Sequence, residues 1–593
     1  MGMTRRALLA SSAAMALLGA AGSAIAQAKR PNIVVILADD VGYSDFSSYG
    51  GEIPTPNIDA LGAGGLKFTQ FYNCARCSPS RASLLTGAWP HQAGLGHLEQ
   101  FAIPESAGIR GALMNRVVTF AELLKDAGYF TAMAGKWHLG ISRGVGPWNR
   151  GFDRSCASPQ GRMYFPDMTT NNPVNKDIYI DGKLFDISAP QVGKGQWYSA
   201  DLFVDYGIRY IHEARRQKKP FVFYLPFVNA HAPLMAPKED IARFKGRYMA
   251  GWDAVRQARF ERQKALGILG PDQILPPREP NTYNWDKLTP KEKDDFDTIM
   301  AIYAANVARM DKAIGTLVSA LKSMGEIDNT LILFMSDNGG NAEAGPDGEL
   351  EGKIPGSPDS YVAAGMEWAT LQNTPFRYFK HFVGEGGIST PLVVHWPNGI
   401  DRSRNGSYVK EMGHLVDVMP TLLEVTGVQY PKTYKGQELV PLQGQSFAPT
   451  FRMTSWNRSG PLFFEHEGNR AIRSGQWKLV QNWGQQWCLY DMTTDRSETR
   501  DIAASRPDLV YSLAAQWNIW ASRSFMDPWT TEINKMIFPK APRQNWAGAG
   551  IPKLPHAMDA AAKWPYRPSA AINIAAATKA GLSDYWKPVP ESP

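Results

Sequence analysis

The stretch NIVVILADD, residues 32–40, decides the fold of this chain. Its first seven residues form a continuous apolar run rich in β-branched side chains, which is typical of a central parallel strand covered by helices on both faces. Asp39 and Asp40 follow where that strand would end. Taken alone, an acidic pair after a strand is part of a turn or a helix cap about as often as it is part of a functional site. It becomes a candidate site because ligands of open α/β sheets bind beyond the carboxyl ends of the strands.

Strand-like and helix-like segments alternate from this stretch to about residue 455. This order predicts an α/β fold, with a large, mainly parallel mixed sheet sandwiched by helices. A polar insertion at 240–290 should contain one helix, at 251–266. Further strands are expected at 129–134, 221–228, 330–335 and 391–396, and helices at 118–126, 303–321 and 417–427.

The pattern changes after about residue 455 to short strands at close spacing, followed by a helix at 507–522. This predicts a smaller C-terminal subdomain of antiparallel sheet plus helix. We therefore divide the chain into a catalytic α/β domain at 30–455, this subdomain at 456–540 and an irregular tail at 541–593. The four short strands are expected at 462–465, 469–472, 477–480 and 487–490.

Residues 1–26 have the features of an export signal. Arg5 and Arg6 precede an Ala- and Leu-rich stretch, and Ala24-Ile25-Ala26 offers a small-residue cleavage site. The segment resembles a twin-arginine signal, with an ordinary secretory signal as the alternative. Because no other run is long and apolar enough to span a membrane, we expect a mature chain without a membrane span, exported to a bacterial periplasm.

The composition of the 593-residue chain argues against a nucleic-acid partner. Its formal net charge is only +7, without a long basic run. An excess of this size suits a small anionic substrate. The chain has four cysteines, too few for a disulfide scaffold. A single bridge between Cys156 and Cys488 is compatible with the sequence.

Polar residues follow four of the expected strands, so they should meet at one edge of the sheet. Asp39, Asp40, Asp337 and Asn338 offer only oxygen atoms, and carboxylates crowded together repel one another unless a cation lies among them. Oxygen ligands favour a hard cation, and Ca²⁺ tolerates irregular coordination better than Mg²⁺. The other polar residues that follow these strands are Lys136, His138 and His231.

The stretch CARCSPSRASLLTG, residues 74–87, combines a cysteine pair with a helix start. Ser78 is a good N-cap and Pro79 a favoured first helical residue, so a helix should run from here to Gly87. Cys77 would then lie just before the helix, where free amides attract an anion and lower a thiol pKa. Arg81 would provide a bidentate anion ligand nearby. A redox pair or half of a zinc site is the competing interpretation, but no second Cys or His pair has the matching spacing.

These residues resemble the type I sulfatases, which depend on formylglycine and belong to the alkaline phosphatase superfamily, and among them the bacterial arylsulfatases. The resemblance spans roughly residues 30–500 in the family's order. It rests on the long signature Cys77-Ser78-Pro79-Ser80-Arg81-Ala82-Ser83-Leu84-Leu85-Thr86-Gly87, and on the segments 38–45, 135–140, 231–233, 336–339, 373–377, Lys380, 385–388 and 477–479. Related phosphatases have an Asp-His pair where this chain has Asp337-Asn338, which favours one hard cation and a sulfatase.

The resemblance implies that a separate maturation enzyme oxidises Cys77 to Cα-formylglycine. One hydroxyl of the aldehyde hydrate would attack the sulfur of a small-molecule sulfate ester, and deprotonating the other would release sulfate and restore the aldehyde. By the same resemblance, one Ca²⁺ would be held by Asp39, Asp40, Asp337, Asn338 and modified Cys77. Roles also follow for Arg81 in holding the hydrate, for Lys136 and Lys380 in binding sulfate, for His138 as base and for His231 as acid.

Three alternatives stay open. A phosphonate monoester or phosphodiester hydrolase shares the formylglycine signature, whereas an unmodified binder of sulfated ligands or a thiol redox protein is not a hydrolase. We expect substrate specificity in the loops 155–180, 240–290 and 341–372. Tyr164, Tyr361 and Trp368 are candidates for an aromatic wall, with aryl or short alkyl sulfates as the expected substrates. We expect His97 and His414 to be structural.

Overall fold

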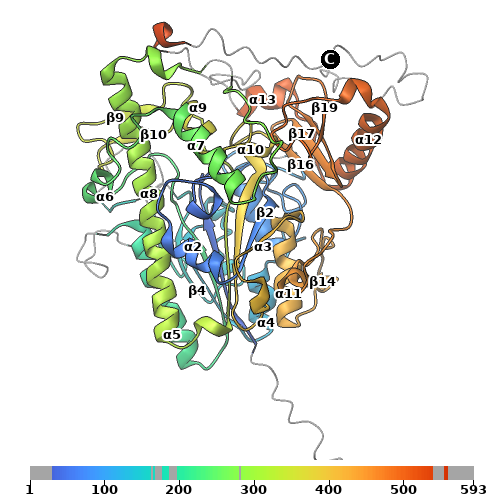
Figure 1. Ribbon diagram of the computed structural model, residues 1–593. Coiled ribbons are helices and arrows are strands. Elements are labelled where there is room, and N and C mark those ends of the chain that lie inside the picture. The colour runs from blue at the N-terminus through green and yellow to red at the C-terminus, as the bar shows by residue number, and fades with distance from the viewer. Residues whose placement is uncertain are drawn as a thin grey trace, which may run out of the picture.

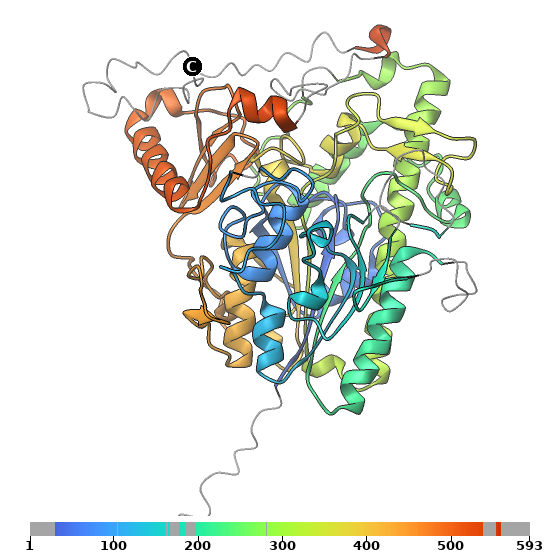
Figure 2. The same cartoon turned by 180° about the vertical axis from the view of Figure 1, so that it is seen from behind.

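The structure is a computed structural model that describes residues 30–103, 105–161, 164–166, 177–185, 197–279, 282–537 and 553–558. The expected signal at 1–26 and most of the expected tail at 541–593 lie outside the described residues. Figures 1 and 2 show a large sheet between two groups of helices, with a smaller sheet beside one end of it. The fold class predicted from the sequence is therefore confirmed.

Strand β1 (Asn32–Ala38) lies inside an 11-stranded sheet, with β8 and β7 parallel to it on either side. Strands β3 and β4 extend this parallel block beyond β7, whereas β11 runs antiparallel to both β8 and β2, which makes the sheet mixed. The order along the sheet is β12-β2-β11-β8-β1-β7-β3-β4-β5-β6, with β13 beside β2. The bounds are β2 Leu66–Tyr72, β3 Phe130–Lys136, β4 Arg154–Ser158, β5 Tyr179–Ile180, β6 Lys183–Leu184, β7 Phe221–Pro226, β8 Thr330–Ser336, β11 Ser389–His395, β12 Ser407–Val409 and β13 Gly413–His414.

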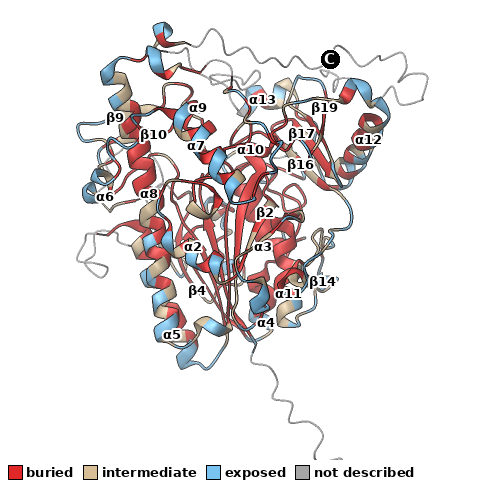
Figure 3. Cartoon of the chain, viewed as in Figure 1, coloured by how far each residue is buried: buried red, intermediate tan, exposed pale blue. Residues whose placement is uncertain are grey.

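The side chains of β1 alternate between two apolar layers. Ile33, Val35 and Leu37 pack with α3, α4 and α11, whereas Val34 and Ile36 pack with α2, α5 and α8. Because both faces of the strand are covered, every residue of β1 is buried, as its continuous apolar run predicts. Figure 3 shows the interior of the large sheet as largely buried. The helices are α2 Pro56–Ala63, α3 Cys77–Thr86, α4 Phe120–Asp126, α5 Ser199–Arg216, α8 Pro290–Ser323 and α11 Val418–Thr426.

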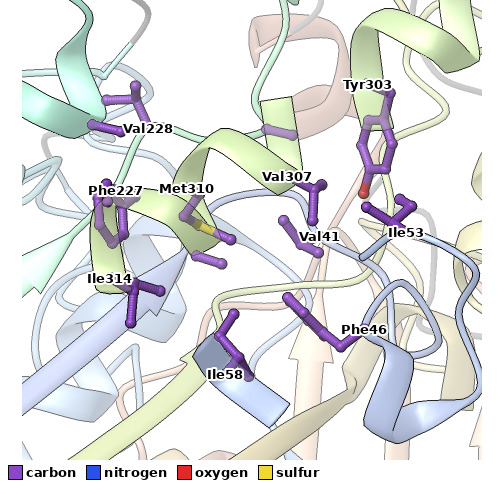
Figure 4. Close-up of a cluster of buried hydrophobic side chains, with 14 of the residues drawn as sticks. Val41, Phe46, Ile53, Ile58, Phe227, Val228, Tyr303, Val307, Met310 and Ile314 are labelled. Atoms are coloured by element: carbon purple, nitrogen blue, oxygen red, sulfur yellow. The ribbon is translucent and has the colours of Figure 1, made fainter. Parts of the chain in front are cut away.

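Helix α8 carries most of one layer. Figure 4 shows Val307, Met310 and Ile314 of this helix among buried side chains that include Val41 and Ile58. The helix has 34 residues and begins earlier than the stripe at 303–321 predicted. The missed signal is a capping box: the hydroxyl of Thr289 accepts from the amide of Glu292, and the carboxylate of Glu292 accepts from the amide of Thr289. Pro290 occupies the first helical position, which it favours.

The four expected C-terminal strands form an antiparallel sheet, β16-β17-β18-β19, on which α12 packs through Val510, Leu513 and Trp517. A buried ion pair joins this sheet to the rest of the molecule. The Nζ atom of Lys478 lies 3.0 Å from Oε1 of Glu385, which belongs to α10 (Glu385–Ile388). The bounds are β16 Leu462–His466, β17 Asn469–Ser474, β18 Trp477–Gln481, β19 Cys488–Asp491 and α12 Pro507–Arg523.

The polar insertion contains the helix predicted from the sequence, α7 (Trp252–Ala265). Arg259 of this helix is fully buried and pairs with Asp45, at 2.7 Å, and with Glu52, at 2.7 Å. The insertion is thereby anchored to the loop that follows β1. The remaining helices and strands are α6 Lys238–Ala242, α9 Met366–Gln372, α13 Thr531–Ile537, β9 Glu349–Glu351, β10 Tyr361–Ala363, β14 Thr433–Tyr434 and β15 Gln437–Glu438.

All four cysteines are free thiols, so the bridge that the sequence allowed between Cys156 and Cys488 is not formed. Cys156 lies in β4 of the large sheet and Cys488 in β19 of the small one. Within the described ranges, no helix combines the length and the apolar character needed to cross a membrane.

Glu367 of α9 makes the stability of the fold depend on pH. Burial raises the pKa of this carboxyl to about 8, although the amide of Tyr283 donates to it at 2.7 Å. The folded chain therefore keeps a proton that the unfolded chain releases above its ordinary pKa of 4.5. Stability that is complete below that value is lost as the pH rises toward about 8.

We expect Glu367→Gln to abolish this dependence, since glutamine stays neutral. One pKa unit corresponds to about 1.4 kcal/mol, so the unfolding free energy of the wild type should fall by several kcal/mol more than that of the variant between about pH 5 and pH 8. Denaturant unfolding at both pH values measures the difference. Equal pH dependence in the two proteins would contradict the prediction.

Candidate active site

The side chains predicted from four strand ends lie together. Asp39 and Asp40 follow β1, and Asp337 and Asn338 follow β8, which pairs with β1 along its whole length. The Sγ atom of Cys77 lies 3.7 Å from Oδ1 of Asp39 and 3.5 Å from Oδ1 of Asn338. All five residues are buried, with at most 1% of their surface exposed. The predicted meeting of these strand ends with the start of α3 is thus observed in the geometry.

Helix α3 begins earlier than the sequence predicts. Its N-cap is Arg76 in an extended conformation, so Cys77 is the first helical residue, and the prediction of a cap at Ser78 is wrong. The hydroxyl of Ser78 instead accepts a bond from the amide of Glu99, at 3.3 Å. The helix ends at Gly87 as predicted, in the left-handed conformation that favours glycine.

Three carboxylates of the site each face a cationic side chain. Asp39 Oδ2 lies 2.6 Å from Lys136 Nζ, and Asp40 lies 2.9 Å from Lys380 Nζ. Asp337 Oδ2 accepts two bonds from Arg81, at 2.7 Å and 3.0 Å. Both members of every pair are buried, so the six charges cancel where water cannot screen them.

Burial and these pairs move the pKa values in opposite directions. Burial raises the pKa of Asp39 to about 7, although Lys136 partly opposes it. Burial would also raise the pKa of Asp40, but Lys380 and His231 outweigh it and hold this pKa well below its usual range. For Cys77, burial raises the thiol pKa to about 12. The pKa thus moves in the direction opposite to the expectation from the helix start, because desolvation of the thiolate outweighs Lys136 and Lys380.

Two histidines flank the cysteine. His231 bonds through Nδ1 to the carbonyl oxygen of Ala232, at 2.6 Å, so its Nε2 faces Lys380 Nζ at 3.5 Å and Asp40 Oδ2 at 3.6 Å. His138 Nε2 lies 3.2 Å from Oε1 of Gln100.

The backbones of Asp40 and His138 are both left-handed, with φ of 57° and 56°. This conformation is unfavourable for residues other than glycine and clusters at functional sites.

A small cavity of about 20 Å³, room for about one water molecule, opens onto these groups. Five of its lining residues were not expected from the sequence, because they come from loops without regular periodicity: Arg76, Leu98, Gln100, Gln160 and Glu343. Asn341 was also missed, although its amide donates to Asp40 Oδ2 at 2.8 Å. The complete lining is Arg76, Cys77, Leu98, Gln100, His138, Gln160, His231, Glu343 and Lys380.

The aromatic wall expected from the sequence is wrong. Tyr164 is fully buried and stacks on Tyr198, and Trp368 is fully buried in the core beside α8. Tyr361 pairs within the β9–β10 hairpin. Among the residues that the structure describes, no aromatic side chain lines the cavity. His97 and His414 are buried outside the lining, as the sequence predicts for structural residues.

The donor set fits a hard cation. Asp39, Asp40, Cys77 and His231 each place one ligand atom within 4.8 Å of the others, all of them buried. Asn338 donates to Asp40 from its amide nitrogen, at 2.7 Å, so its amide oxygen faces Cys77. Asp337 Oδ1 lies 3.3 Å from the backbone nitrogen of Asp40. Carboxylate and amide oxygens outnumber the single imidazole, which favours Ca²⁺ or Mg²⁺ over zinc.

Comparisons with known proteins point in the same direction as this geometry. The Sulfatase family model matches residues 31–428, and the model for the C-terminal part of N-sulphoglucosamine sulphohydrolase matches 375–515. An arylsulfatase of Klebsiella aerogenes is 37% identical over 455 residues, which cover 74% of this chain and 96% of the relative. An uncharacterized sulfatase of Schizosaccharomyces pombe is 34% identical over 534 residues, or 84% and 95% of the two chains. The solved structure of Ps i-CgsB in complex with k-i-k-neocarrahexaose matches with a TM-score of 0.61 and 26% identity, over 83% of this chain and 93% of that one.

Proposed function

This chain belongs to the sulfatase family, and on that premise we propose that it hydrolyses aryl or alkyl sulfate monoesters to a phenol or alcohol and inorganic sulfate. Family membership makes it a sulfuric ester hydrolase; the kind of ester and the mechanism are the proposal. The observation that carries it is the position of Cys77, in the first turn of α3 and within 3.7 Å of Asp39 and Asn338.

We propose that a separate maturation enzyme converts Cys77 to Cα-formylglycine. The Cys77–Gly87 signature supports this, and so does the raised pKa of the thiol, which makes unmodified Cys77 a poor nucleophile near neutral pH. The aldehyde hydrate supplies a nucleophilic hydroxyl and a second hydroxyl whose deprotonation releases sulfate. We assign Arg81, which lies in α3 with Cys77 and contacts Asp337, to holding that hydrate.

The cationic groups account for binding of the sulfate. Lys136 and Lys380 would leave their carboxylate partners and contact sulfate oxygens. Asp39, Asp40, Asp337, Asn338 and modified Cys77 would hold Ca²⁺, which polarises the sulfate and offsets its charge. With a divalent cation among charges that otherwise cancel, the site becomes net positive and attracts a sulfate ester.

The two histidines account for the proton transfers. His231 Nε2 faces the cavity beside Lys380, so we assign it, with Lys380, to protonating the leaving oxygen. His138 lines the other part of the cavity with Gln100, and we assign it as the base that removes a proton from the hydrate.

A substrate panel tests the proposal. Protein produced with an active maturation system should hydrolyse 4-nitrophenyl sulfate at least about tenfold more efficiently, in kcat/KM, than a matched phosphonate monoester or phosphodiester. The His231→Ala variant serves as a control, and its loss should be smaller for esters with acidic leaving groups, which depart without a proton. A preference for the phosphonate by orders of magnitude would assign the chain to the phosphonate hydrolases instead.

We also propose that residues 1–26 direct export to the periplasm. Arg5 and Arg6, the apolar stretch that follows them and the site at Ala24–Ala26 support this. Fractionation of cells that express the full chain, with Arg5 and Arg6 replaced by lysine as the comparison, tests it. Retention of the double variant in the cytoplasm identifies twin-arginine export.

A further inference from the structure

Glu343 is the solvent-accessible charge of the candidate active site. It lies in the loop between β8 and β9 and lines the same cavity as Cys77, His231 and Lys380. Its side chain is 30% exposed, compared with 5% for Arg76 and 1% for Lys380. If sulfate binds beside Cys77 and Lys380, this carboxylate borders the space that is left for the alcohol part of a substrate.

Three basic side chains surround Glu343. Oε1 lies 3.0 Å from Arg76 Nη2 and 3.1 Å from His381 Nε2, and Oε2 lies 3.4 Å from Lys380 Nζ. The amide nitrogen of Asn341 also donates to Oε2, at 2.9 Å. Burial opposes ionisation, but Arg76 and Lys380 outweigh it and hold the pKa of Glu343 well below its usual range. Glu343 is therefore a fixed negative charge.

Arg76 is the partner of Glu343 most relevant to substrate binding, because it is the N-cap residue of α3, next to Cys77, and also lines the cavity. A guanidinium at this place would attract a second anionic group of the substrate. Glu343 pairs with Arg76 and so opposes that attraction. Its carboxylate faces the substrate group that lies next to the ester. A second anion brought directly beside this carboxylate is repelled by it at short range.

We propose that Glu343 is a specificity-determining residue, which admits sulfate esters with an uncharged alcohol part and rejects those with a second anionic group beside the ester. The inference rests on the proposed sulfatase activity and deepens it. Rejection by like charge is a common source of specificity, because one unfavourable charge pair separates two substrates that have the same shape.

Two isosteric substrates isolate the charge: 3-carbamoylphenyl sulfate, which is neutral apart from the ester, and 3-carboxyphenyl sulfate. The wild type should prefer the carbamoyl compound by at least about tenfold in kcat/KM. In Glu343→Gln the preference should shrink by at least about tenfold or reverse, since Arg76 then lacks its contacting carboxylate. Glu343→Asp should retain it.

Glu467→Gln is the matched control. Its carboxylate contacts His381 Nδ1 at 3.3 Å, on the side away from Glu343, and it does not line the cavity. Glu467 also acts on Arg76 but from outside the cavity lining, so removing its charge should change the preference far less than Glu343→Gln does. A nonspecific effect of a lost buried carboxylate would instead change both variants alike.

Each outcome decides the inference. Equal use of the two substrates by the wild type overturns it, and so does an unchanged preference in Glu343→Gln. Inactivity of Glu343→Gln toward both compounds also overturns it, because Glu343 would then be needed to position Lys380. Failure of the wild type to hydrolyse even phenyl sulfate, with Cys77 fully modified, would instead refute the proposed function itself.

Discussion

Replacing Cys77 by alanine is expected to abolish hydrolysis of an aryl sulfate, whereas replacing Cys74 is not. Loss of a covalent nucleophile lowers kcat by orders of magnitude, here on the order of 10³-fold or more. The fold should survive, because the Cys77 thiol makes only long contacts with Asp39, at 3.7 Å, and Asn338, at 3.5 Å. Initial rates with 4-nitrophenyl sulfate measure the effect, and thermal unfolding shows that the variant is folded.

Cys74→Ala is the matched control from the same segment. The Cys74 thiol is buried beside Ser83 Oγ, at 3.4 Å, and His414 Nε2, at 3.8 Å, and lies outside the cavity lining. Its loss should cost about 1 kcal/mol of stability and little activity. Mass spectrometry of the tryptic peptide completes the test, since an intact thiol at Cys77 in fully active protein would contradict the formylglycine proposal.

Removing divalent cations with a chelator should lower both activity and thermal stability, and Ca²⁺ should restore both. A cation that binds only the folded chain stabilises it by about 2.7 kcal/mol at a hundredfold excess over its dissociation constant. The cation would also replace Lys136 and Lys380 as the counter-charge of Asp39 and Asp40, which would free these lysines for sulfate. Unfolding curves of chelated protein with increasing Ca²⁺ or Mg²⁺ measure the effect without any substrate.

Asn338→Ala tests the ligand set without changing its charge. The variant loses one oxygen beside Cys77 but none of the three carboxylates, so the concentration of Ca²⁺ that gives half of the stabilisation should rise about tenfold or more. Glu367→Gln, which removes a buried acid outside the site, should respond to Ca²⁺ like the wild type. A melting temperature of the wild type that neither cation changes would contradict the proposed cation site.

Local sequence patterns determine most of the fold. The apolar run at 32–38 predicts a strand buried on both faces because only such a place accepts side chains of one kind at every position. Gly87 ends α3 because the left-handed conformation there favours glycine. Asp39, Asp40, Asp337 and Asn338 could be grouped in advance, since parallel strands bring their carboxyl ends to one edge.

Other properties depend on contacts between distant segments. The sequence suggests a lowered pKa for Cys77, but the buried environment raises it, because desolvation depends on what all surrounding segments contribute. The sequence suggests Tyr164 and Trp368 for an aromatic wall beside the substrate, but both are buried in the core. No local sequence pattern marks Arg76, Glu343 and His381 as site residues. Their role depends on contacts with one another that form only in the folded chain.

The sequence by itself thus determined the fold class, the family and the groups at the strand ends, although it did not reveal elements such as β2 and α5. These depend on periodicity and on short motifs that the chain carries within a few residues. Only the tertiary structure decided the charge balance around Cys77, the polar lining of the cavity and the place of Glu343 between Arg76 and Lys380. Those properties come from burial and from distances between loops far apart in the chain, which no local pattern encodes.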